Sequence, residues 1–120
     1  MCRLQSKSIL AADKLRRDGK SRDEVLALVP AEPQDVPAAK RVRLLEVTRE
    51  NVEDVFDFRD LGPYTLYMFR WNVCARELLT VTRMARAATV HPQLAACQSR
   101  YSETQQCLQD LVLNVLKARD

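Results

Sequence analysis

The chain has 120 residues and a mass of 13.8 kDa, enough for one hydrophobic core in a single domain. Two glycines and five prolines are too few for many short strands, and 47% hydrophobic with 29% charged residues excludes a disordered or collagen-like chain. The net charge is only +3, and the sequence lacks the dense clusters of basic residues that bind nucleic acid. No stretch without charged residues is long enough for a membrane span. We therefore expect an all-α fold over residues 1–120, a compact bundle of five to six helices.

The amino-terminal third predicts two helices and a stiff loop. Apolar residues recur at helical spacing over 3–18, where an Asp-Gly pair ends the helix. Ser21 and Glu24 form a capping box that starts a short second helix. The segment 30–37, PAEPQDVP, has three prolines and is expected to form an extended loop.

The middle of the chain predicts two longer helices joined by a tight turn. Pro63 suits the first turn of the second of them, which we expect to continue to about Ala88. Its first three turns are apolar on nearly every side, so it either lies at the centre of the bundle, which we favour, or forms half of an interface. The first of these helices, over 38–59, carries an apolar stripe of Val42, Leu44, Leu45, Val47, Val52, Val55 and Phe56.

The carboxyl-terminal part predicts a helical hairpin over 92–118. Its first helix begins after a His-Pro pair. Ser102 and Gln105 form a second capping box, which predicts a break in the chain and a last helix over 103–118.

The four cysteines favour two disulfides over a metal site. They form no C-x-x-C pair, and the chain has a single histidine, so the ligand spacing of structural zinc is missing. Of the three pairings we prefer Cys2 with Cys74 and Cys97 with Cys107; the rival joins Cys2 to Cys107 and Cys74 to Cys97. Cys97 and Cys107 would lie about 15 Å apart along an unbroken helix, so their bond requires the predicted break near Tyr101.

Two disulfides indicate an oxidising compartment, a bacterial periplasm or a secreted setting. The start of the chain has no apolar signal segment, so we interpret Met1 as an added start residue before a mature chain. One alternative makes Cys2 the lipid-modified first residue of a lipoprotein. Another is a cytoplasmic protein with four reduced thiols.

Few residues have the pattern of a catalytic or cofactor site. A Cys–His nucleophile would need His91, which precedes a proline and is expected outside a helix. Glu53 and Asp54 each lie about one helical turn or less from Asp57, and we interpret all three as a solvated helix face rather than an acid–base pair. Both glycines fall in predicted turns, which leaves no phosphate-binding loop. We therefore predict neither catalysis nor a cofactor nor a metal.

Two sets of side chains on the predicted 63–88 helix are candidate binding surfaces. Tyr64, Tyr67 and Trp71 have the spacing of interface anchors, although we favour core packing for them and allow for one exposed tyrosine. A basic strip, interpreted as facing solvent, consists of Arg76, Arg83 and Arg86.

The segments ILAADKLRRDGKSRDEVLALVP, LLEVTRENVEDVFDF and YMFRWNVC, which lie between Cys2 and Cys74, resemble small exported proteobacterial proteins with paired cysteines. The resemblance covers residues 2–74. Helical, disulfide-bearing periplasmic proteins of this type resemble immunity proteins that neutralise peptidoglycan amidase effectors of type VI secretion. Such proteins are often homodimers and insert a loop or helix end into the effector's cleft. The resemblance implies a periplasmic, non-catalytic inhibitor whose partner is a cognate cell-wall hydrolase.

No inhibitory motif can be transferred from that class, so the partner-binding candidates come from the predicted loops. They are polar or aromatic residues in segments that proline stiffens, which lowers the entropy lost on docking. The candidates are Glu32, Gln34, Asp35, Asp60 and Tyr64. The alternative function is a structural or assembly component of the cell envelope, lipid-anchored through Cys2.

Overall fold

A computed structural model of the chain describes residues 2–29, 36–77 and 86–119. Within these ranges the chain forms six α-helices and two short 3-10 helices and contains no strand. In chain order the elements are α1 (Cys2–Arg17), α2 (Arg22–Ala27), α3 (Ala38–Asp57), α4 (Pro63–Glu77), η1 (Ala87–Val90), α5 (His91–Gln98), η2 (Tyr101–Glu103) and α6 (Thr104–Arg119). The prediction of an all-α bundle is confirmed.

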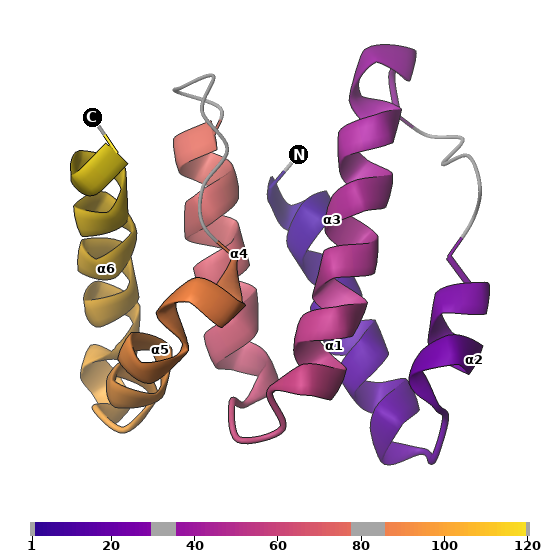
Figure 1. Cartoon of the computed structure of the whole chain (residues 1–120), viewed down its shortest axis with the longest axis horizontal. Helices are drawn as coiled ribbons and strands as arrows, with labels where there is room; N and C mark the ends of the chain where they lie inside the picture. Colours follow the sequence, from indigo (N-terminus) through magenta and orange to yellow (C-terminus); the bar gives the residue numbers. More distant parts are fainter. Residues whose placement is uncertain (1, 30–35, 78–85, 120) are drawn as a thin grey trace.

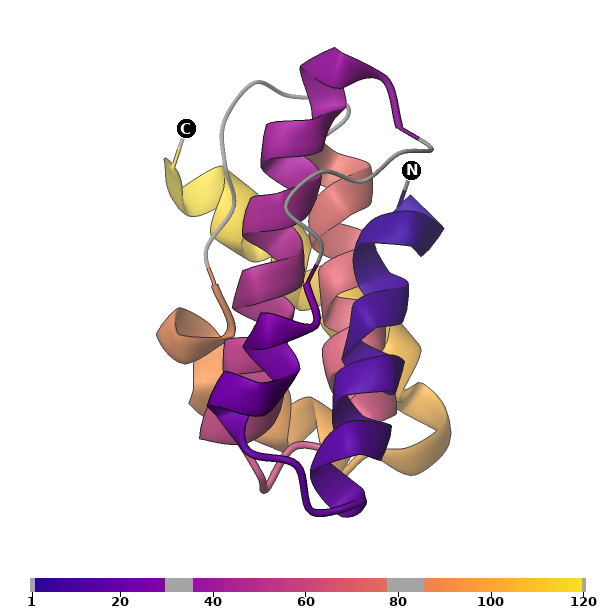
Figure 2. The ribbon, with the colours of Figure 1, turned by 90° about the vertical axis from the view of Figure 1, so that its right-hand side faces the viewer.

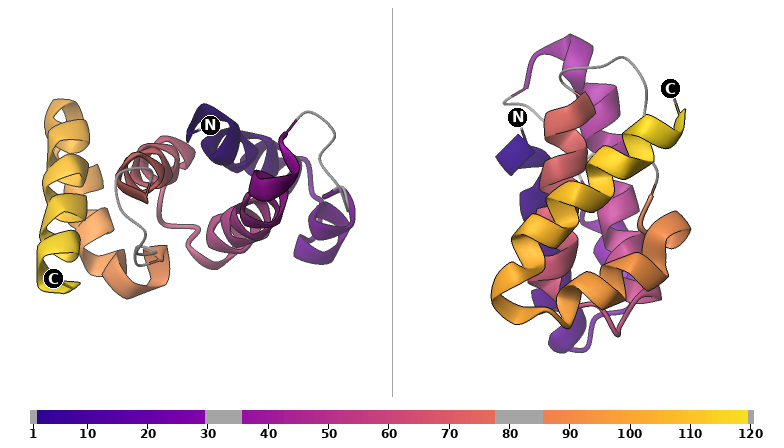
Figure 3. Two further views of the ribbon diagram at one scale, coloured as in Figure 1. Left: turned by 90° about the horizontal axis from the view of Figure 1, so that it is seen from above. Right: turned by 90° about the vertical axis from the view of Figure 1, so that its left-hand side faces the viewer.

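The helices pack around α1 and α4 (Figure 1). α1 contacts α3, α4 and α2, while α4 also contacts α6, which in turn packs on α5. Seen from above, α4 lies between the α5–α6 pair and the α1–α3 pair, as expected for a central helix (Figure 3). α1 and α3 run in one direction and α4 returns, so the turns after α1, α3 and α5 lie at the same end of the molecule (Figures 1 and 2).

The core receives buried apolar side chains from every α-helix and from η1. Because each helix contributes at least one of them, the apolar stripes predicted from periodicity meet in one cluster. The cluster consists of Ile9, Ala12, Val25, Val52, Val55, Leu61, Leu66, Phe69, Val73, Ala87, Val90, Leu94, Cys97, Leu108 and Val112.

Two disulfides close the bundle with the preferred pairing. Cys2 of α1 is bonded to Cys74 of α4, with Cα atoms 5.4 Å apart. Cys97 of α5 is bonded to Cys107 of α6, with Cα atoms 5.5 Å apart. The break required by the second bond falls at residues 99–103, as predicted.

The first turn of the chain also follows the prediction. Gly19 has φ +93°, and the amide of Lys20 donates to the carbonyl of Leu15, which is the bond pattern of a glycine-ended helix. Ser21 Oγ accepts from the amide of Glu24 at 3.1 Å, and Glu24 Oε1 accepts from the amide of Ser21 at 3.2 Å. This capping box starts α2, as expected.

Three sequence predictions about helices are wrong. Val42 of the predicted apolar stripe is 66% exposed, because the first turns of α3 project beyond the amino end of α1 (Figure 1). No continuous helix reaches Ala88: Arg86 is extended, with φ −83° and ψ 164°, and a 3-10 helix follows it. His91 is helical and begins α5, with Pro92 in the first turn, where a missing amide hydrogen is tolerated.

Candidate functional site

One side of α4 exposes aromatic residues to solvent. Tyr64 and Trp71 are 70% and 44% exposed, whereas Leu66 and Phe69 of the same helix are buried in the core. Residues seven apart lie on one face of an α-helix, so Tyr64 and Trp71 share a face. The interpretation as core packing is therefore wrong for Trp71, while Tyr64 is the one exposed tyrosine for which the prediction allowed.

A groove of about 270 Å³ lies beside Trp71. Its wall comes from α4 and from the start of α6, and its lining residues are Tyr67, Met68, Trp71, Asn72 and Gln105. Aromatic rings and a methionine form the apolar part, and two side-chain amides supply polar groups. Asn72 Nδ2 donates to the carbonyl of Met68 at 2.8 Å, which fixes the orientation of that amide. Exposed aromatic side chains next to an apolar groove are typical of protein interfaces.

The turn before α4 holds the amino end of this surface in place. Gln98 of α5 donates to the carbonyl of Asp60 at 2.9 Å and accepts from the amide of Gly62 at 2.6 Å. His91 Nε2 lies 2.7 Å from Asp60 Oδ2, and the His91 ring stacks on Phe58 with centroids 4.9 Å apart. Asp60 of this turn and Tyr64 of the first turn of α4, both predicted contact residues, are exposed.

The other three predicted contact residues lie outside the described residues. Glu32, Gln34 and Asp35 belong to the segment 30–35. Described chain resumes with Val36, whose carbonyl accepts from Arg41 Nε at 2.9 Å.

The carboxylates of α3 are engaged by arginines, and the interpretation of all three as a solvated face is wrong for Asp54. Asp54 is 3% exposed, and its Oδ1 accepts from Arg86 Nη2 at 2.9 Å. Glu53 Oε2 accepts from Arg86 Nη1 at 3.3 Å, and Asp57 pairs with Arg22 of α2. Arg86, predicted to lie on a solvent-facing strip, thus ties η1 to α3.

A buried polar network continues from these carboxylates to α1. Arg70 of α4 is 3% exposed and donates through Nε to Asn51 Oδ1 at 2.9 Å and through Nη2 to Glu50 at 3.2 Å. Asn51 Nδ2 donates to the carbonyl of Gln5 at 2.7 Å and to Ser8 Oγ at 2.9 Å. The network therefore links α4 to α3 through the charge of Arg70, and α3 to α1 through the neutral amide of Asn51.

Two pKa values are shifted within this network. Burial raises the pKa of Asp54 above its ordinary value, although Arg86 and Arg70 oppose the shift. Burial by itself lowers the pKa of Arg86, but the charge of Asp54, followed by those of neighbouring glutamates, raises it overall. Paired structural groups also shift their pKa values, and the packing of α3 against Arg70 and Arg86 accounts for both shifts.

A second cavity, of about 540 Å³, lies at the end of the molecule where the turns meet. Its lining residues are Arg16, Gly19, Lys20, Ser21, Arg22, Phe56 and Arg59. Three of its cations face carboxylates: Arg16 bonds Asp13 at 2.9 Å, Lys20 lies 3.8 Å from Glu24, and Arg22 pairs with Asp57. These pairs neutralise most of the positive charge that an anionic ligand would use.

Other classes of site have no candidate in the described ranges. No group of three or more His, Cys, Asp or Glu side chains there is arranged to hold a metal ion. Among the same residues, no helix is long and apolar enough to span a bilayer.

The disulfides bear on the compartment and on the lipid-anchor alternative. Two disulfides fit an oxidising compartment outside the cytoplasm. A lipoprotein carries its lipid on the sulfur of its first cysteine, and the sulfur of Cys2 is bonded to Cys74. The lipid anchor and this disulfide are therefore mutually exclusive.

The sequence contained a signal for part of the surface and none for the rest. The spacing of Tyr64, Tyr67 and Trp71 marked them as candidate anchors. Met68 and Asn72 of the groove carried no separate signal, and Gln105 joins them only because α6 packs on α4.

Comparison of the chain with protein-family models, with curated proteins and with solved structures gave no match.

Proposed function

We propose that this chain is a non-catalytic binding protein that engages a partner protein through the α4 surface, defined as Tyr64, Tyr67, Met68, Trp71, Asn72 and Gln105. The observation that carries the proposal is the exposed pair of Tyr64 and Trp71 beside an apolar groove. Burying the exposed part of one tryptophan side chain is worth about 2 to 3 kcal/mol, which is the size of an interface hot spot. A soluble chain that leaves both rings exposed gains this energy only when a partner covers them.

The partner in this proposal is a secreted cell-wall-degrading enzyme whose active site the chain occludes. The chain would then be a periplasmic immunity protein for a peptidoglycan amidase of type VI secretion or a similar hydrolase. Two features support this finer proposal: the resemblance of residues 2–74 to small exported proteins, and disulfides that suit the oxidising periplasm. The same disulfides hold α1 to α4 and α5 to α6, and a rigid scaffold of this kind loses less entropy on docking.

Calorimetric titration with the product of the neighbouring gene tests the proposal, because a toxin and its immunity protein must be inherited together. We expect one-to-one binding in the nanomolar range and loss of the partner's hydrolase activity. Trp71→Ala should weaken binding by roughly 30-fold or more, which corresponds to about 2 kcal/mol. Val42→Ala is the matched control, since Val42 is 66% exposed but lies on the far part of α3. Absence of heat with both proteins folded would contradict the proposal.

Two competing assignments of the contact surface have their own outcomes. If replacing Glu32, Gln34 and Asp35 together by alanine abolishes binding and Trp71→Ala leaves it intact, the contact belongs to the segment 30–37. Immunity proteins of this type include homodimers, so a second copy of the chain competes for the same groove. Sedimentation of the chain alone would show a dimer that Trp71→Ala dissociates if a second copy is the occupant.

A further inference from the structure

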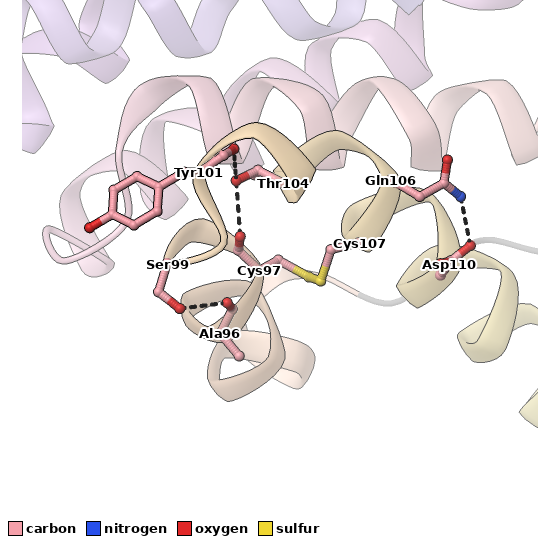
Figure 4. Close-up of a disulfide and its surroundings, with 8 residues drawn as sticks. All are labelled: Ala96, Cys97, Ser99, Tyr101, Thr104, Gln106, Cys107 and Asp110. Carbon is pink, nitrogen blue, oxygen red and sulfur yellow. Dashed lines mark hydrogen bonds between the residues drawn. A yellow bond between two sulfur atoms is a disulfide. The ribbon is translucent and has the colours of Figure 1, made fainter.

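The turn between α5 and α6 presents an unusual tyrosine. Tyr101 has φ +56° and is, within the described ranges, the one residue other than glycine with a positive φ. Its side chain is 89% exposed, more than any other large hydrophobic residue described. Figure 4 shows the ring projecting away from the helices that flank the turn.

The turn is held rigidly around this residue. The Thr104 hydroxyl is buried and lies 2.8 Å from the carbonyl of Tyr101 and 3.0 Å from that of Cys97, so its proton bridges the two (Figure 4). The amide of Arg100 donates to the carbonyl of Cys97 at 3.1 Å. The Cys97–Cys107 disulfide crosses the base of the turn. These bonds keep the backbone of Tyr101 in a conformation that an L-residue rarely adopts.

A tyrosine at this position does not serve the fold. Glycine adopts a positive φ without steric cost, whereas a tyrosine must bring its Cβ close to the backbone. The exposed ring contributes little burial to offset that cost. Strained residues of this kind concentrate at ligand-binding and catalytic sites.

We propose that Tyr101 is an anchor side chain by which the hairpin 97–107 enters an apolar pocket of the partner protein. This inference rests on the proposed function and adds a second contact to it. Gln105, which lines the groove on α4, lies in the same hairpin four residues after Tyr101, so this hairpin already contributes to the α4 surface. A rigid aromatic side chain in a closed turn loses little entropy on docking, which is the property expected of an element inserted into a cleft.

The chemistry of the turn favours a protein partner. The residues around Tyr101 are polar and exposed and form a rim around one ring: Ser99, Arg100, Ser102 and Glu103. An apolar anchor with a polar rim is the usual anatomy of a protein contact. A glycan strand is the competing ligand, because exposed aromatic rings also stack on sugars.

Titration with the neighbouring gene product, using variants at Tyr101, tests the inference. Tyr101→Ala should weaken binding by roughly 30-fold, and Tyr101→Phe, which keeps the ring, by less than about fivefold. Tyr101→p-benzoylphenylalanine should photo-crosslink to the partner, while the same residue at Val42 should not. The Tm of Tyr101→Gly should exceed that of Tyr101→Ala by about 4 °C, although both variants lose binding.

Each result decides the inference. Full-strength binding by Tyr101→Ala, together with weakened binding by Trp71→Ala, would overturn it and leave the proposed function intact. Absence of binding by the unsubstituted chain would overturn both. Binding to soluble peptidoglycan fragments that Tyr101→Ala abolishes, without any effect on the protein titration, would assign the ring to a glycan and overturn the inference.

Discussion

Removal of the Cys2–Cys74 disulfide should destabilise the protein more than removal of Cys97–Cys107. The first bond joins residues 72 apart and the second joins residues 10 apart. Loss of loop-closure entropy from the unfolded chain makes the bonds worth about 4.4 and about 2.7 kcal/mol respectively. The variants are Cys2→Ala with Cys74→Ala, and Cys97→Ala with Cys107→Ala. Alanine avoids placing an unpaired hydroxyl at the three cysteine positions that are buried.

Urea unfolding followed by circular dichroism at 222 nm measures both losses. With a slope of about 1.5 kcal/mol per molar urea, the difference of about 1.7 kcal/mol separates the two midpoints by about 1 M. The oxidised, unsubstituted chain is the reference and should have the highest midpoint. Equal midpoints, or a lower midpoint for the variant without Cys97–Cys107, would refute the loop-length reasoning. An unchanged midpoint after full reduction of the unsubstituted chain would refute the presence of the bonds.

Four further predictions concern the interior and the first turn. Because burial raises the pKa of Asp54 above 3.8, unfolding free energy falls as pH rises from 3.8 through the folded pKa, and Asp54→Asn should remove that fall. Hydrogen bonds from the Ser21 amide and hydroxyl lower the pKa of Glu24, so the free energy of unfolding rises with pH up to 4.5, and Glu24→Gln should remove that rise. Urea titrations between about pH 3 and 6 measure the pH dependence for both Asp54 and Glu24. Arg70→Met should lower the free energy of unfolding by about 3 to 5 kcal/mol, because it leaves buried carboxylate and amide groups without their donor; a loss under about 1 kcal/mol would contradict a buried ion pair. Gly19→Ala should cost about 1 kcal/mol in the same assay through its φ of +93°, and a loss no greater than that of a Lys20→Ala control would contradict the role of backbone strain.

The helices could be predicted because their signals are local. The capping box at Ser21 and the Asp-Gly pair before it fix a turn through bonds between residues three to five apart. The Cys97–Cys107 bond was predictable for a similar reason. It requires a break in the helix between the two cysteines, and the sequence has a helix-start signal at that place. Such constraints depend only on neighbouring residues, which a single sequence displays.

The errors arose where burial depends on segments far apart in the chain. Asp54 is buried, and the arginine that pairs with it, Arg86, lies 32 residues later in the chain. Val42 is exposed because α3 is longer than the helix beside it, and periodicity gives the side a residue faces but not the length of its neighbour. Trp71 is exposed for the related reason that no described helix covers that side of α4 completely.

The candidate surface was therefore only half predictable. Aromatic spacing identified Tyr64 and Trp71, but the groove beside Trp71 required the packing of α6 on α4. Tyr101 had no signal of its own, because a positive φ at a residue other than glycine is set by the surrounding bonds.

The order of the disulfides along the chain has a consequence for how they form. The first cysteine is bonded to the second and the third to the fourth, so the two closed loops follow one another and do not interlace. In a chain that enters an oxidising compartment amino end first, Cys2 stays a free thiol until Cys74 enters, and the two can form their disulfide before Cys97 enters. When Cys74 enters, Cys2 is the free thiol that it meets, and when Cys107 enters, Cys97 is the free thiol that it meets. Vectorial oxidation thereby avoids thiol–disulfide shuffling, whereas the reduced full-length chain must choose among three pairings.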